Sequence, residues 1–269
     1  MKDLKQSLTT PDTKNKEFSN SIDKTLGVID CIFEEEGTFI DIQKKLNLPK
    51  ATLHRILQSL EKYELIEKIP STDCYRLGLK FIYYSEAVKT RLSIPSIAQP
   101  YLQALASSIR EATALSVLYE DHCMSLVSCR GEDSALTSNL LPFPTLNCSA
   151  SGKLFLATRS DKELKEYFAG ANLKKLTYNT IVTYEAFKEE QAKILEKGLA
   201  YDDEENEYGL FCISAPLFNH TGQINANIGI TAPKSRLFTQ DVDAIISQLK
   251  DTAREISDIL IKTKCVCPY

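Results

Sequence analysis

The stretch from residue 21 to residue 77 constrains the fold more than any other, because its apolar residues change from helical to strand-like spacing. Residues 21–35, 38–46 and 49–63 each place apolar side chains along one helical face, which predicts three helices. Two short apolar runs follow, separated by the turn residues PSTD, and they predict a β-hairpin. Helix, short helix, turn, helix and hairpin, in this order, are typical of a winged helix-turn-helix domain.

The ends of these predicted helices carry local signals. Thr38 and Asp41 form a variant of the capping box. In this motif the two side chains accept hydrogen bonds from the unpaired backbone N–H groups of the first turn. Asn47 lies in the turn before the third helix, where a left-handed backbone is often needed and Asn tolerates it. Pro49 opens the third helix, because its missing N–H costs nothing in the first turn.

The third predicted helix has an outer face that suits a negatively charged partner. At about 100° per residue, its leucines and Ile56 gather on one side. The opposite side holds small, polar or cationic residues and no carboxylate before Glu61. Arg55 could bond a guanine edge or a phosphate, and Lys50 and Thr52 could bond phosphates. A solvated helix face remains the alternative. Together with the hairpin cations, the candidate DNA-binding residues are Lys50, Ala51, Thr52, His54, Arg55, Gln58, Lys68 and Arg76.

The charge distribution supports DNA contact by this region alone. The whole chain carries a formal net charge of −4, which argues against nucleic acid binding along its full length. Residues 42–80 hold eight basic and four acidic groups, a local charge of +4, so the remainder carries −8. Phosphate contact requires a local basic patch rather than a basic chain.

The chain beyond this region alternates between predicted helices and strands. Helical spacing at 79–92 leads into Ser93-Ile94-Pro95, and we interpret it as a linker. Further helices are predicted at 96–109, 150–157, 161–168, 184–197 and 239–263, and strands at 114–119, 123–129, 199–203, 210–218 and 223–231. Hairpin-like strand pairs with helices outside them predict an α+β fold with a mainly antiparallel sheet. The predicted divisions are a disordered arm (1–19), a DNA-binding domain (20–78), a linker (79–94) and a second domain (95–269).

Length and composition fit a cytoplasmic protein of two domains. The chain has 269 residues, of which 43% are hydrophobic and 25% charged. Residues 208–233 are uncharged, but Asn, Gln, Gly and Pro interrupt them, so they are not expected to span a membrane. Residues 1–19 are polar without an apolar core, so no secretory signal is expected.

The cysteines show no metal-binding or disulfide pattern. Eight cysteines occur without a C-x-x-C pair, and only three histidines accompany them. A structural zinc site needs four ligands at suitable spacing. We expect reduced, mostly buried thiols and no metal or cofactor, with a metal site as the less favoured alternative.

Five segments resemble the motifs of one known family. SIDKTLGVID resembles the opening of its first helix, LNLPKATLHRILQSLEKYELIEK its helix-turn-helix, and CYRLGLK the Y-x-L-G that closes its wing. LPFPTLNCSASGKLFLA resembles its A-x-G-K-x-x-L-A loop and helix. Residues 198–236 resemble its longest signature, G-x-x-x-D-x-E-E followed by G-x-x-C-x-A-x-P. With these motifs in order over residues 20–263, the chain resembles the IclR-type bacterial transcriptional regulators.

The resemblance implies a DNA-binding winged helix joined by a helical linker to a GAF-like effector-binding domain. It implies a double-stranded DNA operator of pseudo-palindromic sequence and homodimers that pair into tetramers. It also implies a small organic acid or aromatic metabolite as the effector, and a sugar acid belongs to this class. Carried over by motif, the effector-binding residues are Leu136, Ala150, Ser151, Asp202, Leu210, Cys212, Gly229 and Thr231. Backbone N–H groups at the start of the 150–157 helix can hold a carboxylate, and Asp202 and Thr231 can bond ligand oxygens.

The sequence departs from the family pattern at three positions. Ala51 replaces the usual Ser, and Asn47 replaces Gly, in the DNA-binding half. Gly229 stands where many members have Ser, so one polar contact to the effector is expected to be missing. These departures concern the identity of the operator and of the effector rather than the class of protein.

Other sites in the second domain are weighed against simpler interpretations. Asn147 stands where a nucleotide-binding P-loop ending at Lys153 requires Gly, which excludes that loop. Ser149, Ser151 and Lys153 suggest a Ser–Lys hydrolase, but no oxyanion site accompanies them. The acidic run 202–205 suggests a divalent ion, and we favour a solvated turn with Asp202 alone facing the pocket.

Two classes of function therefore remain. A ligand-controlled transcription factor is favoured. The other class is an enzyme or thiol-redox protein built on the second domain, with Cys212 as its reactive thiol rather than a packed pocket residue. A DNA-binding protein whose pocket has decayed is a weaker variant of the first class.

Overall fold

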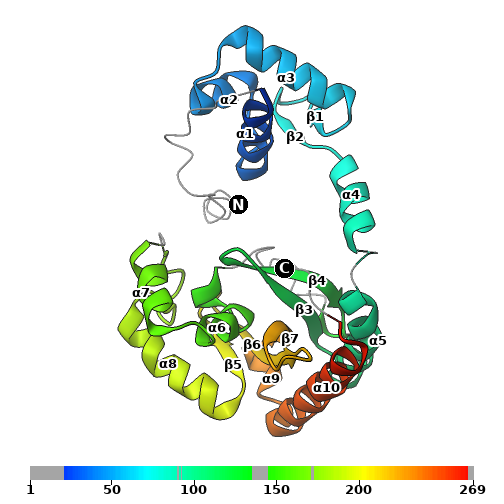
Figure 1. Ribbon diagram of the computed structural model, residues 1–269, viewed down its shortest axis with the longest axis vertical. Coiled ribbons are helices and arrows are strands. Elements are labelled where there is room, and N and C mark those ends of the chain that lie inside the picture. The colour runs from blue at the N-terminus through cyan, green and yellow to red at the C-terminus, as the bar shows by residue number, and fades with distance from the viewer. Residues whose placement is uncertain (1–20, 90, 92, 135–144, 171–172, 266–269) are drawn as a thin grey trace. The chain divides into compact units, whose positions relative to one another are not determined.

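The structure is a computed structural model and describes residues 21–89, 91, 93–134, 145–170 and 173–265 (Figure 1). The chain divides into two compact units, Met1–Arg91 and Leu92–Tyr269, and each is described by itself. The division falls within the segment that the sequence predicts to be a linker.

The N-terminal unit combines helices with a two-stranded hairpin. Its elements are α1 (Ser21–Glu34), α2 (Phe39–Leu46), α3 (Lys50–Lys62), β1 (Ile66–Lys68), β2 (Tyr75–Leu77) and α4 (Lys80–Lys89). The first three helices share a core in which Val28, Ile42 and Leu53 are almost fully buried. The antiparallel strands β1 and β2 add Ile66 and Tyr75 to that core. This is the winged helix-turn-helix arrangement that the sequence predicts.

The ends of α2 and α3 follow their sequence signals. The Asp41 carboxylate accepts the Thr38 backbone N–H at 3.0 Å, and the Thr38 hydroxyl accepts the Asp41 N–H at 3.4 Å, which completes the capping box. Asn47 adopts the left-handed backbone, with φ of 49°, and so ends α2 in a sharp turn. Pro49 lies immediately before Lys50, the first residue of α3.

The C-terminal unit is built around a five-stranded sheet. Its helices are α5 (Ser93–Ile109), α6 (Ala150–Ala157), α7 (Asp161–Gly170), α8 (Tyr184–Lys197), α9 (Lys234–Leu237), α10 (Val242–Thr263) and the short 3-10 turn η4 (Leu146–Cys148). Its strands are β3 (Ala112–Tyr119), β4 (His122–Cys129), β5 (Ala200–Asp203), β6 (Leu210–Phe218) and β7 (Ile224–Pro233). The strand order is β4-β3-β7-β6-β5, and every neighbouring pair is antiparallel. The α+β class and the antiparallel sheet are therefore confirmed, whereas η4 and α9 were not predicted from the sequence.

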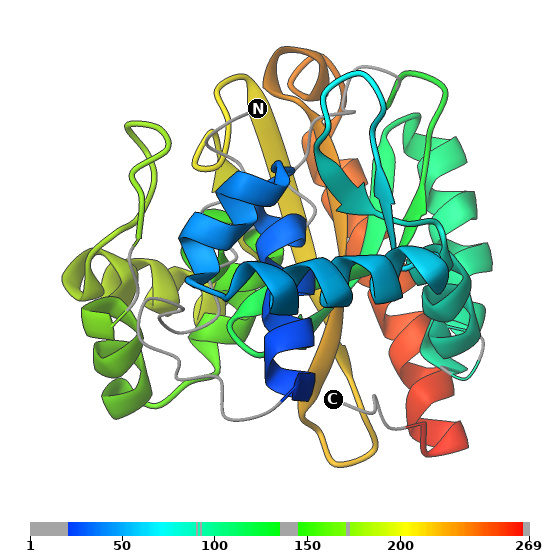
Figure 2. The ribbon, with the colours of Figure 1, turned by 90° about the horizontal axis from the view of Figure 1, so that it is seen from above.

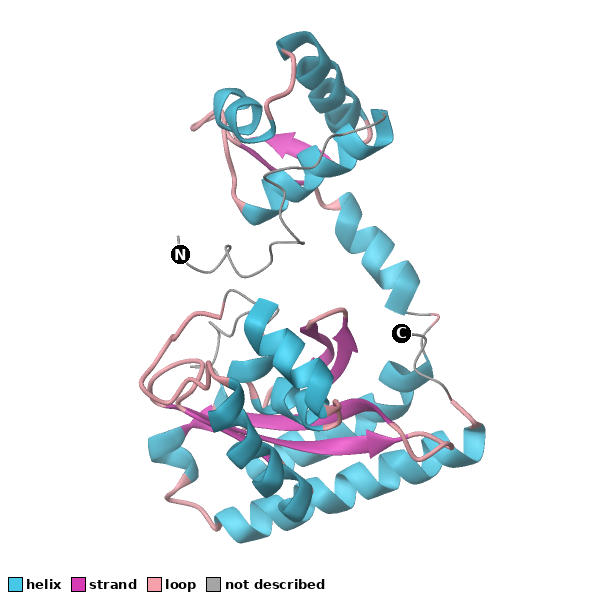
Figure 3. Ribbon diagram, turned by 60° about the vertical axis from the view of Figure 1, so that its left-hand side comes forward, coloured by secondary structure: helices cyan, strands magenta, loops and turns pink. Residues whose placement is uncertain are grey.

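The two faces of this sheet differ in chemistry, because side chains alternate along each strand. Helices α5 and α10 cover one face, where Leu115, Ile213 and Ile228 are fully buried in the main core. Helix α6 contacts strands β5, β6 and β7 on the other face. Figure 3 shows that helices lie on both faces of the sheet. Small and polar residues such as Ser214 and Asn227 replace aliphatic ones on the α6 face, so this face can hold a polar ligand.

None of the helices in the described ranges is long and apolar enough to cross a membrane.

Candidate functional site

Helix α3 presents a polar outer face, as its sequence predicts. Leu53, Leu57 and Leu60 are buried in the core of the N-terminal unit. The residues predicted to contact DNA lie on the other side: Lys50, Ala51, His54, Arg55 and Gln58 are exposed, and Thr52 is half-buried. In Figure 2 the helix is seen along its length, and its C-terminal end leads into the hairpin strands. The exposed polar residues of α3 are therefore followed directly in the chain by those of the hairpin.

The cations of α3 are available for an external anion. Within the described part of the chain, neither Lys50 nor Arg55 takes part in an ion pair. The ring of His54 is held beside Phe39 of α2, with 6.5 Å between ring centroids. Lys50 and Arg55 therefore have the chemistry to bind phosphates or base edges.

The hairpin cations are in a different state. The Lys68 Nζ lies 2.7 Å from the Asp73 carboxylate, and the Arg76 Nε lies 2.6 Å from the Glu67 carboxylate. Glu67 and Arg76 are directly opposed across β1 and β2. All four side chains are exposed, so each ion pair can open and exchange its acid for a phosphate. The local basic patch counted from the sequence is therefore weaker on the hairpin than on α3.

The predicted effector residues gather on the polar face of the C-terminal sheet. Asp202 of β5, Cys212 of β6 and Thr231 of β7 form a row, because each is the register partner of the next. The Thr231 hydroxyl donates to the Cys212 Sγ at 3.4 Å. Gly229 lies on the same face of β7, and the half-buried Leu210 lies at the start of β6.

The start of α6 faces this row. Ser149 caps the helix by accepting the Gly152 N–H at 3.1 Å, and the preceding N–H groups of Ala150 and Ser151 have no acceptor among the described residues. The Ser151 hydroxyl lies 3.0 Å from the hydroxyl of Ser214 on β6. Unpaired N–H groups at a helix start favour a bound anion. Of the eight predicted effector residues, seven lie on this sheet face or on α6, and Leu136 lies outside the described residues.

A buried ionic cluster adjoins this site at Asp202 and Glu205. The Lys153 side chain, which is fully buried, places its Nζ 2.5 Å from Glu205 and 2.8 Å from Glu190. The Asp202 carboxylate accepts the backbone N–H of Glu205 at 2.7 Å and that of Asn206 at 3.3 Å. The prediction of a solvated acidic turn at residues 202–205 with Asp202 alone turned inward is wrong for Glu205, which is buried as well. The internal cation Lys153 could not be inferred as its partner from spacing alone.

The acids of this cluster have unusual proton affinities. Burial raises the pKa of Asp202 to about 6, although backbone N–H groups and Lys153 act in the opposite direction. Burial also raises the pKa of Glu205 to about 7, and Lys153 offsets only part of that effect. Burial acts to raise the pKa of Glu190, but Lys153 and Lys193 together outweigh it, so the pKa is lowered. Glu205 can therefore hold a proton near neutral pH and Asp202 in mildly acidic solution, which reduces their repulsion of an anionic ligand.

Two polar residues of this face were not predicted from the sequence. Ser214 bonds Ser151, and Asn227 donates from its Nδ2 to the Ser151 carbonyl oxygen at 3.2 Å. The signal for Ser214 was present, since the motif G-x-x-C-x-A-x-P has Ala at its position. No comparable signal identifies Asn227, because its position on the polar face depends on the register of β7.

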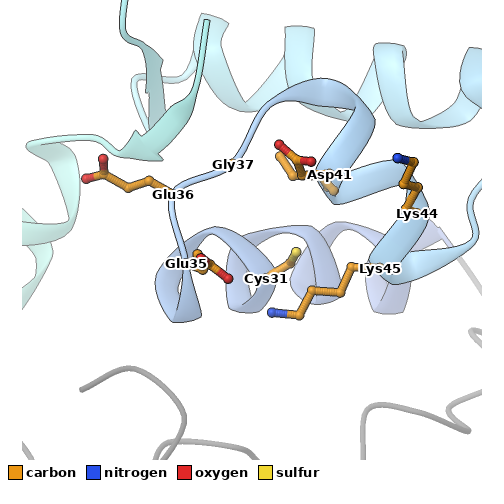
Figure 4. Close-up of a pocket in the computed structure, with 8 residues that line it drawn as sticks. Cys31, Glu35, Glu36, Gly37, Asp41, Lys44 and Lys45 are labelled. Carbon is orange, nitrogen blue, oxygen red and sulfur yellow. The ribbon is translucent and has the colours of Figure 1, made fainter. Parts of the chain in front are cut away.

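A surface depression of about 560 Å³ lies in the N-terminal unit, between α1 and α2 (Figure 4). Carboxylates of Glu35, Glu36 and Asp41 line it together with the amino groups of Lys44 and Lys45. The lining mixes both signs of charge, and Lys45 is already bound to Glu34 at 2.8 Å. The predicted effector residues all belong to the C-terminal unit and do not line this depression.

Two family models match the chain. The model of the IclR helix-turn-helix domain matches residues 21–70, and the model of the C-terminal domain of the bacterial transcriptional regulator IclR matches residues 86–258. The chain belongs to the IclR family of bacterial transcriptional regulators. The family predicted from sequence motifs is thereby confirmed.

Relatives with curated descriptions agree with the IclR assignment. The DNA-binding transcriptional repressor YiaJ of Escherichia coli is 32% identical over 217 residues, which cover 79% of this chain and 77% of YiaJ. The regulator KdgR of Dickeya chrysanthemi is 26% identical over 250 residues, covering 91% and 81% of the two chains. The crystal structure of Thermotoga maritima IclR matches with a TM-score of 0.67 at 29% identity. The match covers 90% of this chain and 99% of the Thermotoga chain.

A more distant solved structure shares the IclR fold. It is an IclR homologue from Microbacterium hydrocarbonoxydans crystallised with 4-hydroxybenzoate, 19% identical, with a TM-score of 0.73 and coverage of 91% and 100%. At this identity the likeness concerns the fold alone.

The IclR assignment excludes the enzyme hypothesis, because the family consists of transcriptional regulators. The local geometry agrees with this conclusion. Lys153 is bound by two carboxylates and Ser149 caps α6, so they do not form a Ser–Lys pair. Burial holds the pKa of the Cys212 thiol well above its usual range, which disfavours a reactive thiolate. No group of three or more His, Cys, Asp or Glu side chains suited to a metal ion occurs within the described ranges.

Proposed function

We propose that this IclR-type regulator binds a pseudo-palindromic operator as a homodimer, or as a pair of dimers, and that a small organic acid controls this binding. The observation that carries the effector proposal is the start of α6. Two N–H groups without an acceptor among the described residues lie there beside the hydroxyls of Ser151 and Ser214. The regulator acts in the cytoplasm, where its operator is.

The effector is a carboxylate that also carries oxygen atoms able to form hydrogen bonds. The carboxylate meets the N–H groups of Ala150 and Ser151, and the row from Asp202 to Thr231 binds the other oxygens. Small hydroxy acids and sugar acids have this chemistry. The 4-hydroxybenzoate bound by the Microbacterium homologue is also a carboxylate with a hydroxyl group, which supports the class but not the identity.

Exposed apolar residues of α4 support the homodimer. Leu79, just before the helix, is 75% exposed, and Ile82, Tyr83 and Val88 are also exposed. An apolar helix surface of this kind is typical of a contact with another chain. A second copy of this chain is the occupant proposed, and the molar mass measured by light scattering tests it.

The test of the DNA-binding surface is the substitution Arg55→Ala. We expect it to remove operator binding in a gel shift with the DNA upstream of the protein's own coding region, because Arg55 loses a base or phosphate contact. Arg254→Ala is the matched control, since Arg254 is an exposed helical arginine of the C-terminal unit. Circular dichroism must show both variants folded, and unchanged operator binding by Arg55→Ala contradicts the assignment of α3.

The test of effector control is a thermal-shift screen with small organic acids and sugar acids. An effector is expected to raise the melting temperature and to change operator affinity in the gel shift. Wild-type binding is also expected to fall steeply with salt concentration, because phosphate contacts release counterions. If every acid leaves both the melting temperature and operator affinity unchanged, the proposed class of effector is wrong.

A further inference from the structure

The Ser214 hydroxyl occupies the space above Gly229. The two residues are register partners across β6 and β7, and Gly229 also faces Ala114 of β3. A Cβ atom added to Gly229 would lie 2.8 Å from the Ser214 Oγ and 3.3 Å from the carbonyl oxygen of Ile213. A side chain at position 229 and the present position of the Ser214 hydroxyl therefore exclude each other.

The Ser214 hydroxyl forms a pair with the Ser151 hydroxyl, at 3.0 Å. Each hydroxyl has one hydrogen, so their mutual bond uses one hydrogen and leaves the other for a further acceptor. The Ser151 Oγ lies 3.7 Å from the position that a Cβ on Gly229 would take. Both hydroxyls therefore border the space that Gly229 leaves empty.

Asn227 places a hydrogen-bond acceptor close to this pair. Its Nδ2 donates to the Ser151 carbonyl oxygen at 3.2 Å, while its buried Oδ1 has no partner in the described part of the chain. A buried acceptor without a donor is costly, and a ligand hydroxyl would satisfy it. The α6 start thus offers N–H groups for a carboxylate, together with a donor and an acceptor for a hydroxyl.

We propose that Ser214 is a specificity-determining residue of the effector site, that Gly229 makes room for its hydroxyl, and that the two select a carboxylate bearing a hydroxyl group. This inference rests on the proposed effector function. It also explains the missing serine at position 229: the hydroxyl has moved to the facing position of the neighbouring strand, where the family motif has Ala.

The experiment is calorimetric titration of the full chain with acids that differ in one feature, the hydroxyl. The pairs are lactate and propionate, D-gluconate and 2-deoxy-D-gluconate, and 4-hydroxybenzoate and benzoate. At least one hydroxy acid is expected to bind more tightly than its partner. Ser214→Ala is expected to weaken that hydroxy acid roughly 2- to 12-fold, the net value of one hydrogen bond, and to leave the partner acid unchanged.

A second substitution tests whether the residues at positions 214 and 229 compete for one space, or whether Ser214→Ala only loosens the packing. Gly229→Ser alone is expected to weaken binding, because it displaces the Ser214 hydroxyl. The double variant Ser214→Ala with Gly229→Ser is expected to recover affinity, because one hydroxyl again occupies the shared space. Ser247→Ala, on the exposed side of α10, is the control and is expected to change nothing.

The inference is overturned if Ser214→Ala weakens both members of a pair equally, if the two single effects add in the double variant, or if no hydroxy acid binds. Its failure is distinguishable from failure of the proposed function. If an acid still controls operator binding while Ser214→Ala leaves the preference for the hydroxyl intact, only the assignment of Ser214 fails. If no acid affects operator binding, the effector proposal fails with it.

Discussion

The ion pairs of the hairpin and those of Lys153 have similar lengths and opposite surroundings. Lys68 lies 2.7 Å from Asp73 on an exposed hairpin, whereas Lys153 lies 2.5 Å from Glu205 and 2.8 Å from Glu190 inside the C-terminal unit. Water competes with an exposed pair, so its net contribution to stability is small. A buried pair is shielded from water, and removal of one partner leaves an uncompensated charge.

Because of this difference in exposure, the hairpin ion pairs can exchange partners and the Lys153 ion pairs cannot. The hairpin pairs can open at little cost, so Lys68 and Arg76 can exchange their acids for phosphates. The Lys153 pairs cannot exchange in this way, and they fix the turn after β5 to helix α6. Reversible contacts thus lie where DNA is expected, and permanent contacts lie beside the proposed effector site.

The largest effect is expected from Lys153→Met. The substitution removes the cation and leaves the buried Glu205 and the half-buried Glu190 without their partner, so the free energy of unfolding should fall by about 3–5 kcal/mol. Urea denaturation followed by circular dichroism measures this change. The additional substitution Glu190→Gln should restore part of the loss, because Glu190 is the ionised partner of Lys153 and is left without a cation.

The control for Lys153 is Lys162→Met on α7. Lys162 is 85% exposed and lies 3.8 Å from Glu166, so its removal is expected to leave stability unchanged. If Lys153→Met behaves like this control, burial does not distinguish the two classes of ion pair.

A second large effect is expected from pH. The pKa of Asp202 is raised to about 6 and that of Glu205 to about 7, so the folded chain keeps protons that the unfolded chain has already released. This contribution to stability is complete below about pH 4 and is lost as the pH rises through 6 and 7. We expect the loss of these protons to lower the free energy of unfolding by about 4 kcal/mol between pH 5 and pH 8.

Thermal denaturation over a pH series, with Glu205→Gln for comparison, measures this dependence. The variant cannot release a proton at position 205, so its stability should change less with pH than that of the wild type. An equal dependence in both proteins would show that Glu205 is already ionised at pH 5.

The smallest effect on stability is expected from Asp73→Asn and Glu67→Gln on the hairpin. Because these pairs are exposed, unfolding should not change measurably. DNA affinity should rise, and the slope of log affinity against log salt should steepen by about one for each cation that gains a phosphate. Fluorescence anisotropy with labelled DNA over a sodium chloride series checks this, with Asp251→Asn on α10 as the control. Unchanged affinity and slope would place the hairpin outside the DNA contact.

Local patterns predicted most of the fold because they act over a few residues. Helical spacing gave α1, α3 and α10, and the turn residues between two apolar runs gave the hairpin. Thr38, Asp41 and Asn47 acted as expected because capping and left-handed turns depend on the residue and its immediate neighbours. The short α9 was missed although Pro233 precedes it, because four residues are too few to show helical spacing.

The candidate site was predictable only where a motif carried it. Ala150, Ser151, Asp202, Cys212, Gly229 and Thr231 were named from motifs, and their functional role stays a prediction. Spacing could not reveal that Glu205 turns inward to Lys153, because they are 52 residues apart in the chain. Nor could spacing reveal that the hairpin cations form ion pairs with neighbouring carboxylates, because the Arg76–Glu67 pair depends on the strand register.

The sequence by itself determined the family, the order of the helices and strands, and the acid-free face of α3. These follow from periodicity and from motifs, which are local properties of the chain. Only the tertiary structure decided which charges are buried and which side chains share one space. Lys153 contacts Glu205, and the Ser214 hydroxyl fills the space above Gly229, because helix α6 packs across strands that are distant in sequence. Burial then sets the strength of each polar contact, and burial is a property of the folded chain alone.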